Sequence, residues 1–207
     1  MPVPVAFPLA TLAALMLLAT SPAAAGPVVL VNALDAPTSG EGLAVAPGDT
    51  VFVSFSTGEE GNLSAITVLL AGQGEVATAG LGFGLFADTV TAPNGSAPGR
   101  LLRRLNAAAP GVLGTGFTAV RLGRIDHVHV PAATRLWIGI TAPPGVGLRW
   151  ATTADLTRAG VAGEFAVGQG TARRSAADHP APQMQVVIDV YEPPLRVNLG
   201  ALWTGRR

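Results

Sequence analysis

The sequence contains no cysteine. This absence excludes disulfide-stapled scaffolds, thiol-based enzymes, and zinc or iron–sulfur sites ligated by cysteine. Lysine is absent as well, so all 13 basic residues are arginine, and 13 acidic residues balance them to a formal net charge of zero. A neutral chain without a basic block lacks the phosphate-neutralising surface of a nucleic-acid binder. We therefore expect no nucleic-acid partner.

Charged residues are also scarce, at 13% of the chain, against about 25% in an average soluble domain. Hydrophobic residues make up 49%, which argues against intrinsic disorder. Glycine and proline are plentiful, with 26 and 17 copies. Such a composition is typical of a chain with a substantial core and many turns.

The N-terminal segment reads as an export signal. Residues 3–20 carry no charge and are rich in Leu, Ala and Met, and Ala23-Ala24-Ala25 supplies the small residues that a signal peptidase recognises. The pattern predicts a signal peptide over residues 1–25, cleaved before Gly26, and a protein that is secreted, periplasmic or at the cell surface. No Lys or Arg precedes the apolar run, and a retained N-terminal anchor helix is the alternative.

The remaining chain has the pattern of strands separated by Gly/Pro-rich turns, and Ala46-Pro47-Gly48-Asp49 is predicted to be one of these turns. No segment shows a sustained helical stripe; residues 154–162 allow at most a helical turn, and residues 168–182, which include Arg173-Arg174, are expected to form a long exposed loop. We predict an all-β fold over residues 26–192, an antiparallel, jelly-roll-like β-sandwich. About ten strands are expected, at residues 28–31, 50–55, 63–70, 80–86, 100–105, 116–120, 125–130, 135–141, 147–152 and 183–191.

Alternation assigns faces to three of these strands. One face of the second should carry Val51, Val53 and Phe55, with Phe52 and Ser54 on the other. In the fourth strand Leu81, Phe83 and Leu85 share a face, and in the last strand Met184, Val186, Ile188 and Val190 alternate with Gln183, Gln185, Val187 and Asp189.

Several stretches, taken in order, resemble the choice-of-anchor β-sandwich domains of bacterial exported proteins, nearest to type R. The matching stretches are FSTG at 55–58, LSAITVLL at 63–70, GLFAD at 84–88, APGRLL at 97–102, PAATRLWIGI at 131–140 and WATT at 150–153. The resemblance spans about residues 45–191 and implies a secreted or surface-displayed module without an assigned activity. It also implies a C-terminal surface anchor, of which the Pro-Glu-Pro sorting tail is one kind.

The C-terminal tail departs from that anchored pattern. Glu192-Pro193-Pro194 and the final Arg206-Arg207 enclose only residues 195–205, and Arg196 and Asn198 interrupt them. A membrane span needs about 20 apolar residues. We therefore expect residues 193–207 to be a short tail without a transmembrane anchor.

His127-Val128-His129 is the best chemical signal in the sequence. Residues i and i+2 of a strand point to the same face, so both imidazoles can reach one metal ion. His179, beside Asp178, is the candidate third ligand. The alternative is a pair of histidines that simply alternate with Asp126 and Val128.

Two tryptophans invite a sugar-binding interpretation, since aromatic rings stack on the apolar faces of sugars. Trp137 lies in an apolar strand and is expected in the core. Trp150 follows Arg149 near a strand end, is expected to be exposed, and is the candidate ligand-binding residue.

The other motifs give weaker evidence for a functional site. Gly80-x-Gly82-x-Gly84 lacks the spacing and following helix of a nucleotide loop, and predicts instead the close approach of a backbone or a bulky side chain over that strand face. The oxygen-bearing side chains of Glu59, Glu60 and Asn62, with Asp88, suit calcium but lack the spacing of a dedicated loop. No nucleophile elbow is present, and no pair of carboxylates stands out for glycoside hydrolysis.

These observations favour an exported, non-catalytic β-sandwich with a surface, matrix or extracellular interaction or structural role. No cofactor is expected. Polysaccharide or a component of the cell envelope is the expected kind of partner. A carbohydrate-binding module is the alternative, and a metal-assisted hydrolase using His127 and His129 is the third possibility.

Overall fold

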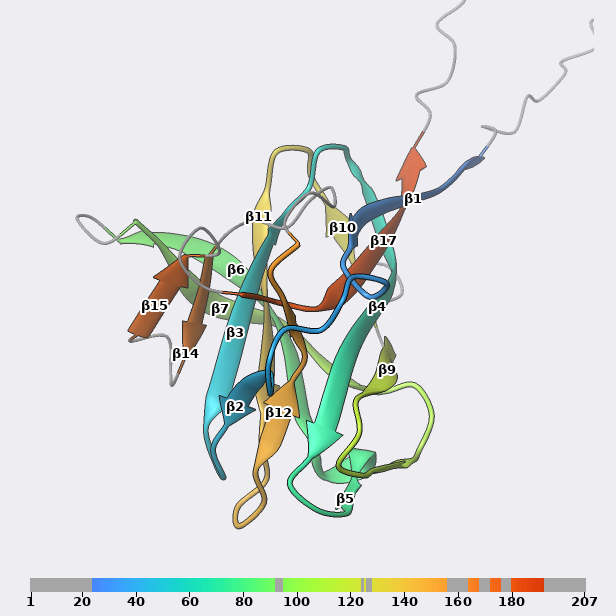
Figure 1. Cartoon of the computed structure of the whole chain (residues 1–207). Helices are drawn as coiled ribbons and strands as arrows, with labels where there is room; N and C mark the ends of the chain where they lie inside the picture. The colour runs from blue at the N-terminus through green and yellow to red at the C-terminus, as the bar shows by residue number, and fades with distance from the viewer. Residues whose placement is uncertain are drawn as a thin grey trace, which may run out of the picture. The chain divides into compact units, whose positions relative to one another are not determined.

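A computed structural model describes residues 24–91, 95–123, 125, 128–155, 164–167, 172–175 and 180–191. Residues Ala24–Tyr191 form one compact unit. Among the described residues, strands and one short 3-10 helix are the only regular elements, and every strand pairing is antiparallel. The predicted all-β, antiparallel, sandwich-like fold is confirmed (Figure 1).

The described part of the chain contains seventeen strand segments, ten of which have four or more residues. Eight of the ten longer strands overlap expected ones, whereas β14 (Glu164–Val167) and β15 (Ala172–Ser175) were not expected. The strands expected at 125–130 and 147–152 correspond to the short β10 and β12. The strands are β1 (Ala24–Asn32), β2 (Leu43–Val45), β3 (Thr50–Ser56), β4 (Gly61–Gly72), β5 (Val76–Ala77), β6 (Gly82–Thr91), β7 (Gly95–Ala107), β8 (Val112–Leu113), β9 (Thr118–Gly123), β10 (His129–Val130), β11 (Arg135–Thr141), β12 (Leu148–Trp150), β13 (Thr152–Thr153), β14 (Glu164–Val167), β15 (Ala172–Ser175), β16 (Ala181–Pro182) and β17 (Met184–Tyr191), with the 3-10 helix η1 at Thr78–Gly80.

One large sheet runs in the order β1-β17-β4-β9-β7-β6-β11-β3-β14-β15 and folds back on itself. β10 and β12 pair with β4, and β2 pairs with β12. The two halves of the sheet join at a single seam, where Asn106 and Ala107 of β7 pair with Gly123 and Leu122 of β9. Beyond this short seam β7 and β9 separate.

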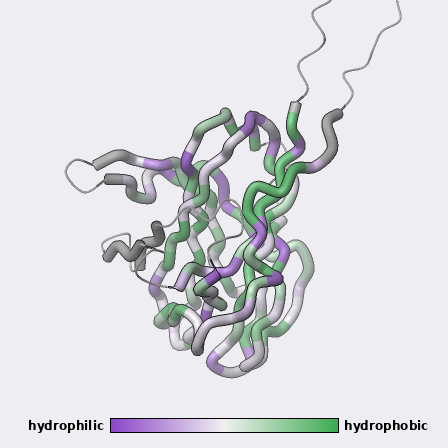
Figure 2. Tube along the Cα trace, turned by 45° about the horizontal axis from the view of Figure 1, so that its top comes forward, coloured by the Kyte–Doolittle hydropathy of each residue, from purple (hydrophilic) through white to green (hydrophobic). Residues whose placement is uncertain are grey.

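The core lies between the two halves of the sheet and follows the predicted alternation. Val51, Val53 and Phe55 of β3 are buried in the main cluster together with Phe83 and Leu85 of β6. Met184, Val186 and Ile188 of β17 enter the same cluster from the other half. Phe52 points to the opposite face and forms a second, smaller cluster with Trp137 and Phe86. Figure 2 shows that the hydrophobic positions follow the strands.

The turn that precedes β3 is of type II. The Asp49 N–H donates to the Ala46 carbonyl at 2.9 Å, Pro47 holds the second position, and Gly48 has a φ of 79°. Type II turns require a positive φ at the third position, which glycine adopts without strain. The predicted turn at residues 46–49 is therefore confirmed, and it fixes the start of β3.

Two sequence expectations need correction. The exposed loop predicted at residues 168–182 is wrong in part, because Ala172–Ser175 forms β15 on the edge of the sheet and Ala181 is buried. The strand predicted at residues 125–130 is reduced to His129–Val130, because the Val128 N–H donates to the Ile125 carbonyl at 3.2 Å, as in a turn.

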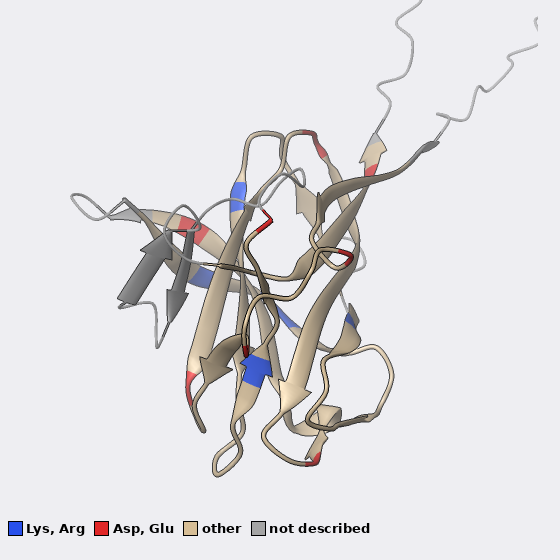
Figure 3. Ribbon diagram, in the orientation of Figure 1, with Lys and Arg blue, Asp and Glu red and all other residues tan. Residues whose placement is uncertain are grey.

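Other expectations fall outside the described residues. They are the signal peptide before Ala24, most of the helical turn at 154–162, and the tail after Tyr191. In the described part of the chain, no helix has the length and apolar character needed to cross a membrane. Figure 3 shows how few charged residues the described strands carry.

Candidate functional site

A depression of about 410 Å³ lies between β6 and β7 on one side and the segment from Val128 to Leu136 on the other. Its apolar part comes from Leu102 of β7, Leu136 of β11, and Val128 and Val130 at β10. Its polar groups are those of Asp88, His129, Thr134 and Arg135. Apolar surface with a few converging polar groups at the open end of a folded sheet is a common arrangement for a binding site.

His129 stands at the rim of this depression. Its Nε2 atom lies 3.3 Å from the Glu60 Oε1 atom, and the two side chains are 48% and 61% exposed. In the ladder of β10 and β4, His129 lies opposite Asn62. An ion pair this exposed contributes about 0–1 kcal/mol at most, and only when the imidazole is protonated. The contact positions the imidazole more than it stabilises the fold.

Asp88 is the most firmly held polar group of the depression. Its Oδ1 atom accepts a hydrogen bond from the Trp137 indole N–H at 2.7 Å, and its Oδ2 atom accepts one from the Ser96 hydroxyl at 3.0 Å. The ladder between β6 and β7 is irregular next to it, between Phe86 and Asp88. Such bulges redirect side chains. Asp88 therefore ties the β6–β7 hairpin to the buried indole of β11.

We expect Asp88→Ala to lower the free energy of unfolding by about 1–3 kcal/mol, because the buried Trp137 N–H loses a charged acceptor. Asp88→Asn is the control, since its amide oxygen still accepts the indole N–H and the Ser96 hydroxyl can accept from its NH₂ group. The midpoint of urea unfolding, followed by tryptophan fluorescence, measures both. Equal losses in the two variants would show that the Trp137 contact does not account for the effect.

The structure describes one of the three histidines predicted to bind a metal. His129 lies on β10 as expected, whereas His127 and His179 lie outside the described residues. In the described part of the chain, no three His, Asp or Glu residues are grouped closely enough to hold a metal ion. The three-histidine site thus stays a prediction.

The side chains considered as calcium ligands do not converge on one point, and the contacts that they make differ. Glu59 and Glu60 are exposed, and Glu60 contacts His129. Asn62 lies within the β4 ladder, and Asp88 is engaged by Trp137 and Ser96. The described geometry gives these side chains separate structural roles.

The prediction that Trp150 is exposed is wrong. Its side chain is 0% exposed, and its indole N–H donates to the Gln183 carbonyl at 2.8 Å. β12 is short but central: it pairs with β2 on one side and with β4 on the other. The ring therefore packs in the core and cannot stack on a sugar. The core position expected for Trp137 is confirmed, because that side chain is also fully buried.

A bulky side chain closely approaches Gly84, as the Gly80-x-Gly82-x-Gly84 pattern predicted. A Cβ atom at this position would lie 2.6 Å from Phe86 Cε2 and 2.9 Å from Leu101 Cδ1. The neighbouring strand repeats the feature, because a Cβ at Gly139 would lie 2.8 Å from the same Phe86 atom. The two glycines, paired across β6 and β11, make the space in which the Phe86 ring lies. Gly84 therefore serves the packing of a side chain and not the binding of a nucleotide.

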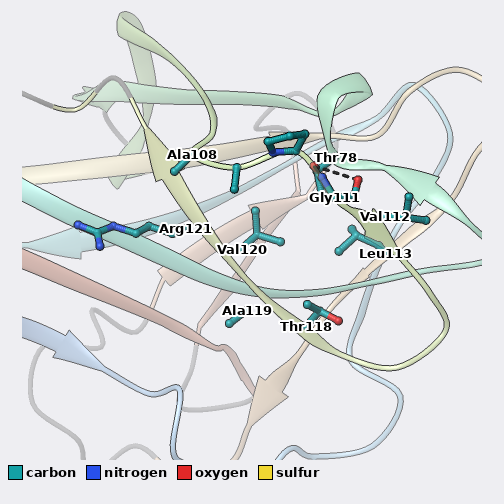
Figure 4. Close-up of a pocket in the computed structure, with 11 residues that line it drawn as sticks. Thr78, Ala108, Gly111, Val112, Leu113, Thr118, Ala119, Val120 and Arg121 are labelled. Atoms are coloured by element: carbon teal, nitrogen blue, oxygen red, sulfur yellow. Dashed lines mark hydrogen bonds between the residues drawn. The ribbon is translucent and has the colours of Figure 1, made fainter.

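A second depression, of about 360 Å³, lies beside η1 and β9 (Figure 4). Its floor is built around Thr78, whose backbone N–H and hydroxyl both bond to Gly111. Val112 at its edge is 63% exposed, and Arg121 extends to one side. Sequence reasoning missed both depressions, because neither the meeting of distant segments at the first nor the folding of residues 108–121 around the second follows from a local pattern.

Comparison with known proteins adds no assignment: no family model, curated protein or solved structure matches the chain significantly.

Proposed function

We propose that this chain is an exported, non-catalytic β-sandwich domain that acts outside the cytoplasm through its surface. The observation that carries the proposal is the coincidence of two boundaries. The sequence predicts cleavage between Ala25 and Gly26, and the compact unit starts at Ala24. Removal of residues 1–25 would leave all but the first two residues of β1, and with them the main core.

The contacts within the larger depression support a structural or binding role over a chemical one. Both oxygens of Asp88 accept hydrogen bonds that tie β6, β7 and β11 together. The Thr57 hydroxyl donates to the Pro131 carbonyl at 2.7 Å, which anchors the segment leading from β10 to β11. These polar groups hold the walls of the depression in place. A surface shaped in this way suits recognition of a partner.

The resemblance to choice-of-anchor domains points in the same direction, towards display at the cell surface or release from it. The carbohydrate-binding alternative loses its named residue, since Trp150 belongs to the core. A sugar site on this surface would have to use other side chains.

Processing tests the proposal. When the full chain is expressed in a bacterium with a general secretion pathway, we expect the exported protein to begin at Gly26, as read by mass spectrometry of the intact protein. Ala25→Leu places a large side chain where the peptidase needs a small one, and should leave most of the protein unprocessed. Gly26→Ala, just beyond the cleavage point, is the control. A protein that stays cytoplasmic with residues 1–25 attached would overturn the proposal.

A further inference from the structure

Strand β7 exposes five consecutive residues, from Arg100 to Arg104. A strand with one buried face alternates between exposed and buried positions, so a fully exposed stretch inside a sandwich is unusual. The cause is the divergence of the sheet: among the described residues, β7 pairs with β9 only at Asn106 and Ala107, and further along the strand only β6 accompanies it. Leu101 and Leu102 are 37% and 38% exposed.

Arg100, Arg103 and Arg104, here called the arginine strip, are the charged part of this stretch (blue on β7 in Figure 3). Within the described part of the chain none of the three has an ion pair or a side-chain hydrogen bond; the contact of His129 with Glu60 is elsewhere, between β10 and the residue just before β4. Asp88, which borders the same depression as Leu102, already accepts two hydrogen bonds. Three guanidinium groups thus face water along about 13 Å of strand.

The geometry of β7 decides how a partner would bind. Between the pairs Leu85–Arg103 and Asp88–Pro98, β7 uses five residue steps where β6 uses three. Two extra residues bulge out of β7, and Pro98 lacks a backbone N–H. An added peptide strand needs a regular row of backbone donors and acceptors, which this edge does not offer. Recognition therefore falls to the side chains.

The side chains select anionic oxygen groups. A guanidinium presents a rigid fork of donors that matches a carboxylate. Arg103 and Arg104 are consecutive and project from opposite faces of β7, so a chain of linked carboxylates that follows this edge can contact both. Leu101 and Leu102 add apolar surface for the C–H faces of sugar rings. We propose that the arginine strip binds a carboxylate-bearing polysaccharide. This inference rests on the surface-interaction role proposed above, but the binding itself does not depend on export.

Binding of the purified protein to polygalacturonate, with neutral dextran as the uncharged comparison, tests the inference. We expect binding to polygalacturonate alone, stronger at about 0.01 M than at about 0.15 M salt, because exposed charge pairs are screened. The triple variant Arg100→Gln, Arg103→Gln, Arg104→Gln should weaken binding about ten-fold, as three exposed pairs would. The corresponding triple Arg→Lys variant keeps the charge but loses the forked donors, and should bind more weakly than the parent and more tightly than the triple Gln variant.

Two single substitutions distinguish binding at the arginine strip from a general effect of removing positive charge. Arg103→Gln should weaken binding about two-fold, whereas Arg121→Gln, an equal charge change on β9, should leave it unchanged. The urea midpoint of each variant, expected to match the parent protein, verifies folding. The inference is overturned if polygalacturonate does not bind, if the triple Gln variant binds as tightly as the parent, or if Arg121→Gln is as harmful as Arg103→Gln.

Two further probes decide between partner classes. Poly-L-glutamate of similar length represents an acidic peptide, and phosphatidylglycerol vesicles represent an anionic membrane. Tighter binding of either than of polygalacturonate would refute the choice of a polysaccharide. Because these assays do not depend on residues 1–25, their failure leaves the processing experiment, and with it the proposal of an exported domain, intact.

Discussion

Replacing Trp150 by alanine is expected to lower the free energy of unfolding by about 3–5 kcal/mol, one of the two largest losses that we predict for a single substitution. The side chain is fully buried, so its removal leaves a cavity between the halves of the sheet. Its indole N–H also gives up the 2.8 Å bond to the Gln183 carbonyl. Both effects act on β12, whose pairing joins β2 to β4.

Trp150→Phe separates the two contributions, because it keeps most of the apolar volume and removes the hydrogen bond. We expect it to cost less than half as much as Trp150→Ala. Denaturation by urea or guanidinium, followed by circular dichroism, measures both variants. A stable Trp150→Ala protein would contradict the buried position of this ring. The result also bears on sugar-binding assays, since lost binding in Trp150→Ala would report unfolding and not a lost stacking platform.

Gln183 is the second position at which we expect a large effect. Its side-chain amide is buried and donates to the carbonyls of Ala33 and Ala36, at 2.8 and 2.7 Å, while its Oε1 atom accepts from the Thr38 hydroxyl at 2.9 Å. The amide thereby holds the segment that follows β1 against the start of β17. Its backbone N–H donates to the Ala151 carbonyl at 2.7 Å, so the residue connects three parts of the chain.

Gln183→Leu is expected to cost about 2–3 kcal/mol. The buried Ala36 carbonyl loses its side-chain donor, and an unsatisfied buried group costs about 1–3 kcal/mol. The Ala33 carbonyl also loses the Gln183 amide but still accepts the Ala36 N–H at 3.3 Å. Gln185→Leu is the matched control, because Gln185 is only half-buried and its amide lies 3.5 Å from the Asn32 Oδ1 atom. Its loss should stay below about 1 kcal/mol. Similar losses at the two positions, measured as shifts of the urea midpoint, would show that the Gln183 contacts are not the cause.

The sequence predicted the bounds of β3 and β11 well, because both are apolar runs rich in β-branched and aromatic residues. In the last strand, however, alternation was less reliable. It misjudged Gln183, which it placed on the polar face of the last strand together with Gln185. The structure buries Gln183 because the segment after β1 closes over that end of β17. The alternation pattern therefore did not indicate that the polar residue Gln183 is buried.

The candidate site was less predictable than the fold. His129 was selected from its spacing to His127, but its contact with Glu60 joins β10 to the chain just before β4. Asp88 was considered only as a possible calcium ligand, whereas its partner Trp137 lies 49 positions away in the sequence. Contacts over such distances depend on the sheet order, which no local pattern specifies.

The sequence by itself determined the all-β character, the apolar inward faces of β3, β6 and β17, and the turn before β3. These features depend on the two-residue period of strands and on the backbone preferences of glycine and proline, both of which are local. Only the tertiary structure decided that Trp150 is buried, that Gln183 joins three segments, and that Arg100–Arg104 lies open. The reason is that burial depends on which strands lie beside a residue, and here on the point at which β7 and β9 separate.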